Sequence, residues 1–539
     1  MIAISDALLY VSFAFVFGYL ILSVISEQRK PEVAMNRSYL FIAIGAIVLL
    51  AAAPAIDIVQ HLMTAFQMPI FEAAITVLGD YQVGQAWMFT LVLALMLIGL
   101  LKLGFEKEKG YRPFLPLLLA VGMVFSVSWA SHGASLDAIG GFLGNGMHLL
   151  AAVSWIGVLL TVSFFVKEDA NWDKFLQWFT PFAIVCVSVM IASGFVLMGY
   201  IVPEYMNSWM LPYGQLLLLK HLLFIPLVFY GFAHGFLLRK KIERKPQFSP
   251  KRSFQIESVI GLAIFVVTAV MSHQTPPHEV ATTLQFELPS TVATALIGDF
   301  VPGSDLQFVV FHPALLAAVA AFGLFIWLGM ILKTQRRLLL APIVTLGIVA
   351  AGYTWVIGST ETTTATVDDT VYEDVQSAVE VTQDGRQVDV LVVEEYKDGY
   401  EAVVYVVDDE LLVTELVEET EDGYQRLPNA TLTVGGEPVK QADHTIRTFI
   451  VRDGFWDHED YEYTYVTLGY VQEPAETSRV EIEYEQMGNF VDVENDAFIN
   501  IAHSDEAWSE NHPINFMADD GTVIGEYMRM EMETGAFCH

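Results

Sequence analysis

Apolar runs of roughly 20 residues fill the first two thirds of this 539-residue chain. A helix rises about 1.5 Å per residue, so each run is long enough to cross the roughly 30 Å of hydrocarbon in a membrane. The sequence therefore predicts an all-α polytopic membrane bundle of about ten transmembrane helices over residues 1–357. The runs lie near 3–26, 38–60, 84–104, 113–131, 141–166, 178–201, 213–238, 254–272, 308–332 and 338–357.

The basic residues of this part indicate how the runs are oriented. No Lys or Arg precedes Arg29, so the first run lacks the basic segment of a secretory signal and is predicted to be an uncleaved helix that starts outside the cell. Nineteen of the 20 Lys and Arg residues before Gly358 then fall on the cytoplasmic side. We predict a multi-pass protein of the cytoplasmic (plasma) membrane with external N- and C-termini. If 38–60 or 338–357 only dips into the membrane, the C-terminal part would instead be cytoplasmic.

The composition changes abruptly after Gly358. Residues 1–357 are nearly neutral, so almost all of the net charge of −34 belongs to the C-terminal part. We predict a linker over 358–370 and an acidic, external, all-β sandwich-like domain over 371–539. Segments with alternating apolar and polar residues support this prediction: 388–394, 401–407, 411–417, 448–452, 461–466 and 480–484.

The charge and the cysteine count limit the possible functions. The acidic surface is either an adaptation to a saline medium or a device that collects cations. It would repel phosphate, so a nucleic-acid partner is not expected, whereas membrane lipid is. Only Cys186 and Cys538 are present, which excludes a disulfide-stapled scaffold. The chain has no nucleotide-binding or hydrolase motif, and we do not expect an enzyme.

Histidines are the most informative residues of the membrane part. On the predicted topology, all but His234 lie toward the external side, and His148 and His221 have similar depth. A single membrane histidine is more often an interhelical hydrogen-bond partner than a ligand, but several on one side favour a shared metal site. Imidazole and thioether ligands suit copper in transit. The candidate metal ligands are His61, His132, Met147, His148, His221, His273 and His312.

Two charged residues lie within or beside the runs. Lys220 would repel a cation at His221 unless a carboxylate pairs with it, and Asp57 is the candidate partner. Glu257 stands near the start of its run, and pairing with the neighbouring basic loop is the simplest role for it.

The C-terminal end offers a second, weaker set of candidate metal ligands. Alternating methionines would share one face of a strand and could hold Cu(I) with the terminal residues. The alternative is an edge strand that faces the core, followed by a frayed terminus. The candidates are Met528, Met530, Met532, Cys538 and His539. His503 and His512 form a further cluster with acidic neighbours.

Four segments of the membrane part resemble the CopD/PcoD family of copper resistance membrane proteins. Residues 147–157 (MHLLAAVSWIG) resemble its His-Leu-x-Ala-x-x-x-Trp-x-Gly-Gly helix, and 179–183 (FTPFA) resembles its Phe-Ser-Pro-x-Ala helix. Residues 213–220 resemble the Tyr-Gly-x-Leu-Leu-x-Lys helix, and 257–277 resemble the closing Glu-x-x-x-Gly…Pro-Pro helix. The resemblance covers roughly residues 115–280.

The resemblance implies copper movement across the inner membrane, often beside a CopC-like periplasmic carrier. The resemblance implies structural or gating roles for Trp155, Lys220 and Glu257. It also supports His132 and His148 as candidate metal ligands. Val158 replaces the family's second glycine, which puts close helix packing there in doubt. The resemblance does not cover residues 358–539.

The sequence thus favours copper transport, in the direction of uptake, through an external His/Met site. One alternative is a redox protein that binds haem b through His148 and His221. A second is a membrane anchor for an external copper-binding or copper-sensing domain.

Overall fold

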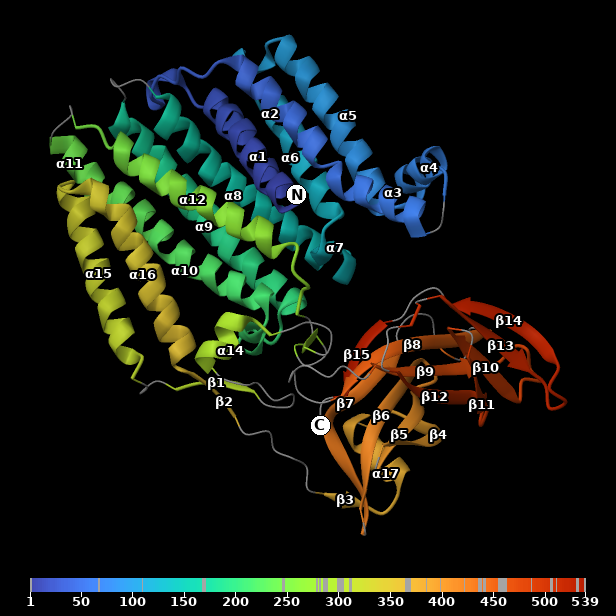
Figure 1. Cartoon of the computed structure of the whole chain (residues 1–539). Coiled ribbons are helices and arrows are strands. Elements are labelled where there is room, and N and C mark those ends of the chain that lie inside the picture. The colour runs from blue at the N-terminus through green and yellow to red at the C-terminus, as the bar shows by residue number, and fades with distance from the viewer. Residues whose placement is uncertain are drawn as a thin grey trace. The chain divides into compact units, whose positions relative to one another are not determined.

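The computed structural model divides into two compact units. The membrane unit comprises residues 1–279, 290–298 and 307–361, and the β unit comprises 280–289, 299–306 and 362–539 (Figure 1). The structure describes all residues except 1, 66–67, 109, 167–170, 245–247, 278–279, 281–282, 285–288, 298–304, 310–312, 364–369, 384, 398, 421, 435–438, 440–442, 454–462, 486, 505–507, 510, 530–532 and 538–539.

The membrane unit is built from apolar helices. In the described part of the chain, nine helical segments are long and apolar enough to cross a membrane. The remaining predicted run, 113–131, forms a helix of 16 residues, about 24 Å long. The helices are α1 (Ile2–Val24), α2 (Arg37–Leu50), α3 (Ala53–Ala65), α4 (Ile70–Asp80), α5 (Gln82–Lys102), α6 (Phe114–Trp129), α7 (His132–Leu136), α8 (Gly140–Phe165), α9 (Trp172–Ile201), α10 (Pro212–Phe232), α11 (Arg239–Arg244), α12 (Lys251–Met271), α14 (Thr291–Ile297), α15 (Leu315–Thr334) and α16 (Ala341–Gly358). The predicted helical bundle is confirmed.

Loops rich in basic residues lie together at one end of this bundle, which we call the basic end. Contacts between these loops and the neighbouring helix ends join segments far apart in the chain: Arg37 with Glu106 at 2.7 Å, Arg239 with Asp173 at 3.7 Å, and Lys251 Nζ with the Val166 carbonyl at 2.9 Å. At the opposite end, Gln82 donates to the carbonyl of Trp129, and His273 contacts Asp6. We call this the histidine end. The short helix α6 therefore reaches from one end to the other.

Helix α8 forms the centre of the membrane unit and packs against α1, α9 and α12. Every residue from Ala151 to Ser163 is buried. A Cβ atom at Gly18 of α1 would lie 2.2 Å from the Gly157 carbonyl oxygen, so the two backbones touch. Val158 is itself fully buried. The doubt about close packing at Val158 was therefore misplaced, because Gly157 alone lets α1 approach α8.

The β unit contains three sheets of antiparallel strands, apart from β15, which runs parallel to β8. The orders are β3-β7-β6-β5-β4, β12-β9-β8-β15 and β11-β10-β13-β14. The strands of the unit are β3 (Val371–Tyr372), β4 (Val388–Lys397), β5 (Tyr400–Val407), β6 (Leu411–Thr420), β7 (Gly423–Val434), β8 (His444–Asp453), β9 (Tyr463–Val471), β10 (Arg479–Tyr484), β11 (Met487–Asp492), β12 (Ala497–Ser504), β13 (His512–Met517), β14 (Val523–Arg529) and β15 (Glu533–Phe537). All six predicted strand segments are found. A separate short pair joins β1 (Leu306–Phe308) to β2 (Thr360–Thr362).

The three sheets stack as layers, with the β12-β9-β8-β15 sheet in the middle. Its Val466 and Leu468 pack against Leu416 of the five-stranded sheet, and its Tyr465 packs with Ile482 of the third sheet. The middle sheet is thus buried on both faces, and β9 is buried at nearly every position. The short helix α17 (Val375–Glu380) also packs on the five-stranded sheet. The predicted all-β domain is confirmed, but it has one sheet more than a simple sandwich.

Candidate functional site

His148 of α8 has its imidazole oriented by α9. Its Nδ1 lies 3.2 Å from Ser193 Oγ, and the Ser193 hydroxyl donates to the Val189 carbonyl at 2.7 Å. Because that hydroxyl proton is already used, Nδ1–H of His148 donates to Ser193 and the lone pair lies on Nε2. Gly194 leaves room for the ring, since a Cβ there would lie 3.5 Å from His148 Cε1. This geometry suits a metal ligand.

His221 of α10 is the second imidazole of this region. Its Nδ1 lies 2.8 Å from the Tyr205 hydroxyl. Tyr205 belongs to the segment between α9 and α10, and burial raises its pKa to about 12. The phenol therefore stays protonated and neutral. His148 and His221 are close enough to interact electrostatically, so the two imidazoles lie in one region of the membrane unit.

Lys220 lies beside both imidazoles and interacts electrostatically with each. Asp57 is exposed on α3, and the described structure contains no ion pair between it and Lys220. The predicted Asp57 partner is therefore wrong. The helix pair α3 and α4 has its own small apolar cluster around Ala55 and Val77, which keeps this part of the chain separate.

A second polar contact at the histidine end joins α1 to the segment after α12. His273 Nε2 lies 2.9 Å from Asp6 Oδ2, and Ser272 Oγ donates to the same oxygen at 3.3 Å. The sequence singled out His273 but not Asp6, which looks like an isolated acid at the start of an apolar run. Nearby, Met271 packs with Tyr213 and Val202.

The other candidate ligands of the membrane unit do not join these residues. His61 and His132 are exposed on α3 and α7, and Met147 is 38% exposed on α8 beside His148. His312 lies outside the described residues. Within the described ranges, no three His, Cys, Asp or Glu side chains come together to hold a metal ion. The fold therefore offers a two-imidazole region rather than a closed cage.

The candidates at the C-terminal end do not form a described cluster. Met528 lies on the edge strand β14 and is 55% exposed, so it does not face the core. Met530, Met532, Cys538 and His539 lie outside the described residues. His512 is fully buried, and its Nε2 lies 2.8 Å from Thr448 Oγ1, whereas His503 is exposed. The suggested His503–His512 cluster is thus not formed.

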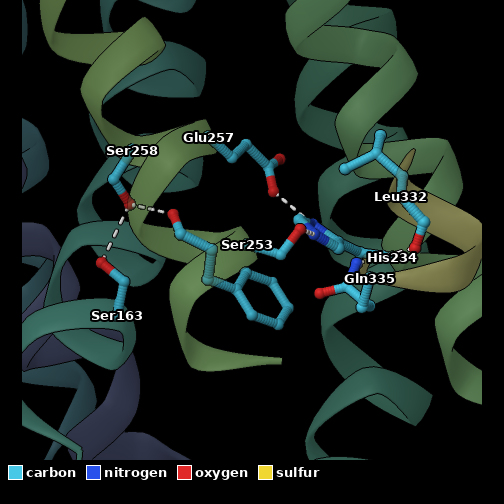
Figure 2. A network of polar contacts seen from close by, with 8 residues as sticks. Ser163, His234, Ser253, Glu257, Ser258, Leu332 and Gln335 are labelled. Carbon is cyan, nitrogen blue, oxygen red and sulfur yellow. Dashed lines mark hydrogen bonds and ion pairs between the residues drawn. The ribbon is translucent and has the colours of Figure 1, made fainter. Parts of the chain in front are cut away.

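A buried polar network lies between α10, α12 and the segment that follows α10 (Figure 2). His234 Nδ1 lies 2.5 Å from Glu257 Oε2, and His234 Nε2 lies 2.7 Å from Ser253 Oγ. The His234 ring stacks on Phe254 with centroids 4.2 Å apart. The expected pairing of Glu257 with the basic loop is therefore wrong, because the carboxylate turns inward to His234.

Local distortion of the backbone places His234 in this network. Residues Ala233–Leu238 form a π-helical turn, which follows Pro226 within α10. Such turns rotate the following side chains out of the α-helical register and often occur at functional sites. This π-helical turn was not predicted from the sequence.

Comparison with known families matches two parts of the membrane unit. Residues 173–271 match the family described as copper resistance protein D, and residues 1–142 match the copper resistance protein D-like N-terminal domain. The membrane unit belongs to the copper resistance protein D family. Lys220, His221, His234 and Glu257 of this CopD unit lie in the first match, and Asp6 lies in the second. His148 and Trp155 lie between the two matched ranges.

One curated relative is the copper transport protein CutJ of Bacillus subtilis (strain 168). It is 31% identical over 211 residues, which make up 38% of this chain and 38% of the relative. The alignment therefore spans well under half the length of either protein. No solved structure matches the chain. The CopD membership and the apolar helices establish a multi-pass membrane protein.

Proposed function

We propose that this CopD-family protein carries copper across the cytoplasmic membrane, in the direction of uptake, through His148 and His221. The observation that carries the proposal is the orientation of His148. Ser193 holds Nδ1, so the metal-binding lone pair of Nε2 is fixed on a helix whose other residues are mostly buried. Hydrogen bonds of this kind orient imidazoles for metals.

The small number of ligands suits a permease. Two imidazoles hold copper less firmly than a closed site of three or four ligands, and a transported ion must leave as readily as it binds. Lys220 would add electrostatic repulsion that keeps the ion from settling at His221. In this proposal Lys220 acts as a gate, in keeping with its match to the family motif.

The histidine end would face outside, because the basic end carries the Lys and Arg residues that the positive-inside rule places in the cytoplasm. The Asp6–His273 pair and the exposed His132 would then receive copper at the outer rim. The acidic β unit would raise the local concentration of copper ions. A CopC-like carrier would serve the same purpose by delivering copper directly. No ATP hydrolysis is required, and the proposed role is transport rather than catalysis.

Copper flux into proteoliposomes tests the proposal. Purified protein should raise copper entry above that of empty vesicles, and His148→Ala should lower it at least tenfold. His61→Ala is the matched control, because His61 lies on α3 outside the proposed site and should leave flux unchanged. Flux no greater than in empty vesicles, or equal flux in wild type and His148→Ala, would show that the proposal is wrong.

A further inference from the structure

The His234–Glu257 pair is a deeply buried pair of ionisable side chains in the membrane unit, and the copper site does not use it. The side chains are 2% and 1% exposed. The pair lies toward the basic end, because Ser253, which contacts His234 Nε2, is in the first turn of α12. Glu257 is one turn deeper. The pair therefore extends from near the basic end into the interior of the bundle.

One oxygen of the carboxyl group has no partner. Glu257 Oε1 is buried without a hydrogen bond in the described structure, and so is Trp155 Nε1. Both side chains border Gly231, where an added Cβ would lie 3.6 Å from Glu257 Oε1 and 3.7 Å from Trp155 Cζ2. A buried carboxylate oxygen without a donor is costly, and protonation of the carboxyl group removes most of that cost.

Within the described residues, the ion-pair partner of Glu257 is His234, and no ion pair joins it to a Lys or Arg side chain. Among the described residues, the nearby cations of α11 and α12 contact other groups: Arg239 contacts Asp173, Lys241 donates to the Thr334 carbonyl and Lys251 to that of Val166. The other titratable group that faces Glu257 is Tyr230 of α10, which is itself hydrogen-bonded to Thr345 of α16.

The groups contributed by the remaining neighbours are neutral. Helix α8 contributes the indole of Trp155, and α9 contributes Thr180, which borders Gly235. From α15 and the residue after it, Leu332 and Gln335 approach His234 (Figure 2). His234 and Glu257 are therefore surrounded mainly by neutral groups.

We propose that His234 and Glu257 form a proton-exchange site that couples proton movement to copper transport. This inference rests on the proposed function. With one proton between imidazole and carboxylate the pair is neutral, and loss of that proton leaves it with a charge of one negative unit. The positive charge of copper, once it moves inward from His148, favours release of the proton, which leaves through Ser253 toward the basic end. A proton returns from the side of the histidine end when copper has left, so each cycle moves one proton across the membrane together with the copper.

The helices provide a physical connection between the two sites. His148 and Trp155 lie two turns apart on α8, and Lys220 and His221 precede His234 on α10 and its π-helical continuation. Pro226 lies between them and removes one backbone hydrogen bond, which gives α10 a place to bend. A change at the histidine end can therefore reach the pair through two continuous elements.

Infrared difference spectroscopy tests the site without copper. In the full-length protein, a pH change should alter a carboxyl C=O band that disappears in Glu257→Gln and persists in Glu106→Gln. Glu106 is the matched control because it is equally buried but paired with Arg37. If the pH-sensitive band is missing in wild type, or persists in Glu257→Gln, the inference is overturned.

Proteoliposomes with a trapped pH indicator test the coupling. Wild type should show proton movement that accompanies copper flux, and flux that an imposed pH gradient changes severalfold. Glu257→Gln should keep copper binding but lose both effects. Copper flux without proton movement would overturn this inference and leave the proposed function intact. A Glu257-dependent band together with no copper flux would support the exchange site and reject the proposed function.

Discussion

The Nδ1 atom of His148 and the Oγ atom of Ser193 lie 3.2 Å apart, across the contact between α8 and α9. Ser193→Ala removes the acceptor that fixes the imidazole tautomer. We expect about a tenfold to hundredfold loss of copper affinity, as is typical when a hydrogen bond to a metal ligand is removed. Titration against a chromophoric copper chelator measures it. Ser163→Ala, in a serine pair with Ser258, is the control and should bind as wild type does.

Replacing Lys220 should separate copper affinity from copper flux. Lys220→Met keeps the length of the side chain but removes the charge that repels copper at His148 and His221. We expect affinity to rise severalfold while flux falls, because the ion leaves more slowly. The chelator titration and the vesicle assay measure the two quantities. A variant with weaker binding and faster flux would contradict the gating role.

Close packing of α1 on α8 should be sensitive to side-chain size. At Gly157 a Cβ would lie 2.2 Å from the Ala14 carbonyl oxygen, whereas at Gly99 of α5 it would meet no atom within 4 Å. Gly157→Leu should therefore lower stability by at least about 1–3 kcal/mol. Gly99→Leu should have little effect. Thermal unfolding in detergent compares the two variants, and equal midpoints would show that the helices do not touch here.

The β unit should loosen in mild acid through His444. Burial lowers the pKa of His444, and the neighbouring Asp443 only partly opposes this effect. The unfolded chain then binds the proton at a higher pH than the folded chain, so stability falls as the pH drops below the ordinary histidine value of about 6.5. Hydrogen exchange of the β8 and β13 peptides, corrected for intrinsic rates, should show faster opening at low pH. The acceleration should be smaller in His444→Gln, and an equal acceleration would contradict this assignment.

A simple spectrum separates copper transport from the haem alternative that the sequence leaves open. If His148 and His221 served as haem ligands, freshly purified protein would show a Soret band that disappears in either alanine variant. The copper-transport account expects no Soret band. The measurement needs no added ligand, and a His148-dependent band would favour the redox protein instead.

Much of the fold was predictable because its strongest signals are local. Apolar length identifies the membrane helices, and alternation identifies strands such as β4 and β10. The third sheet was not predicted, because alternation identifies single strands such as β10 but does not show how many sheets the strands form. The single run predicted over 38–60 is broken at residues 51–52, just before Pro54 in the first turn of α3, a helix-start signal that the apolar length concealed.

The candidate site was predictable only in part, because contacts between distant segments of the chain leave no local signal in the sequence. The predicted depth of each histidine in the membrane placed His148 and His221 at a similar level and His234 toward the opposite end of the bundle. The partners Ser193, Tyr205 and Asp6 come from other helices and loops, and single serines, tyrosines or acids in such segments carry no signal. Glu257 was assigned to the nearest cations in the sequence, whereas the π-helical turn brings His234 to it across 23 residues.

Anomalous scattering at the copper absorption edge, recorded from copper-loaded protein, tests the central claim most directly. The account predicts a copper peak in the membrane unit beside Nε2 of His148, near His221, and its loss in His148→Ala. A peak confined to the β unit would instead support a membrane-anchored copper-binding domain. Either that result or a peak that persists unchanged in His148→Ala would contradict copper transport through this site.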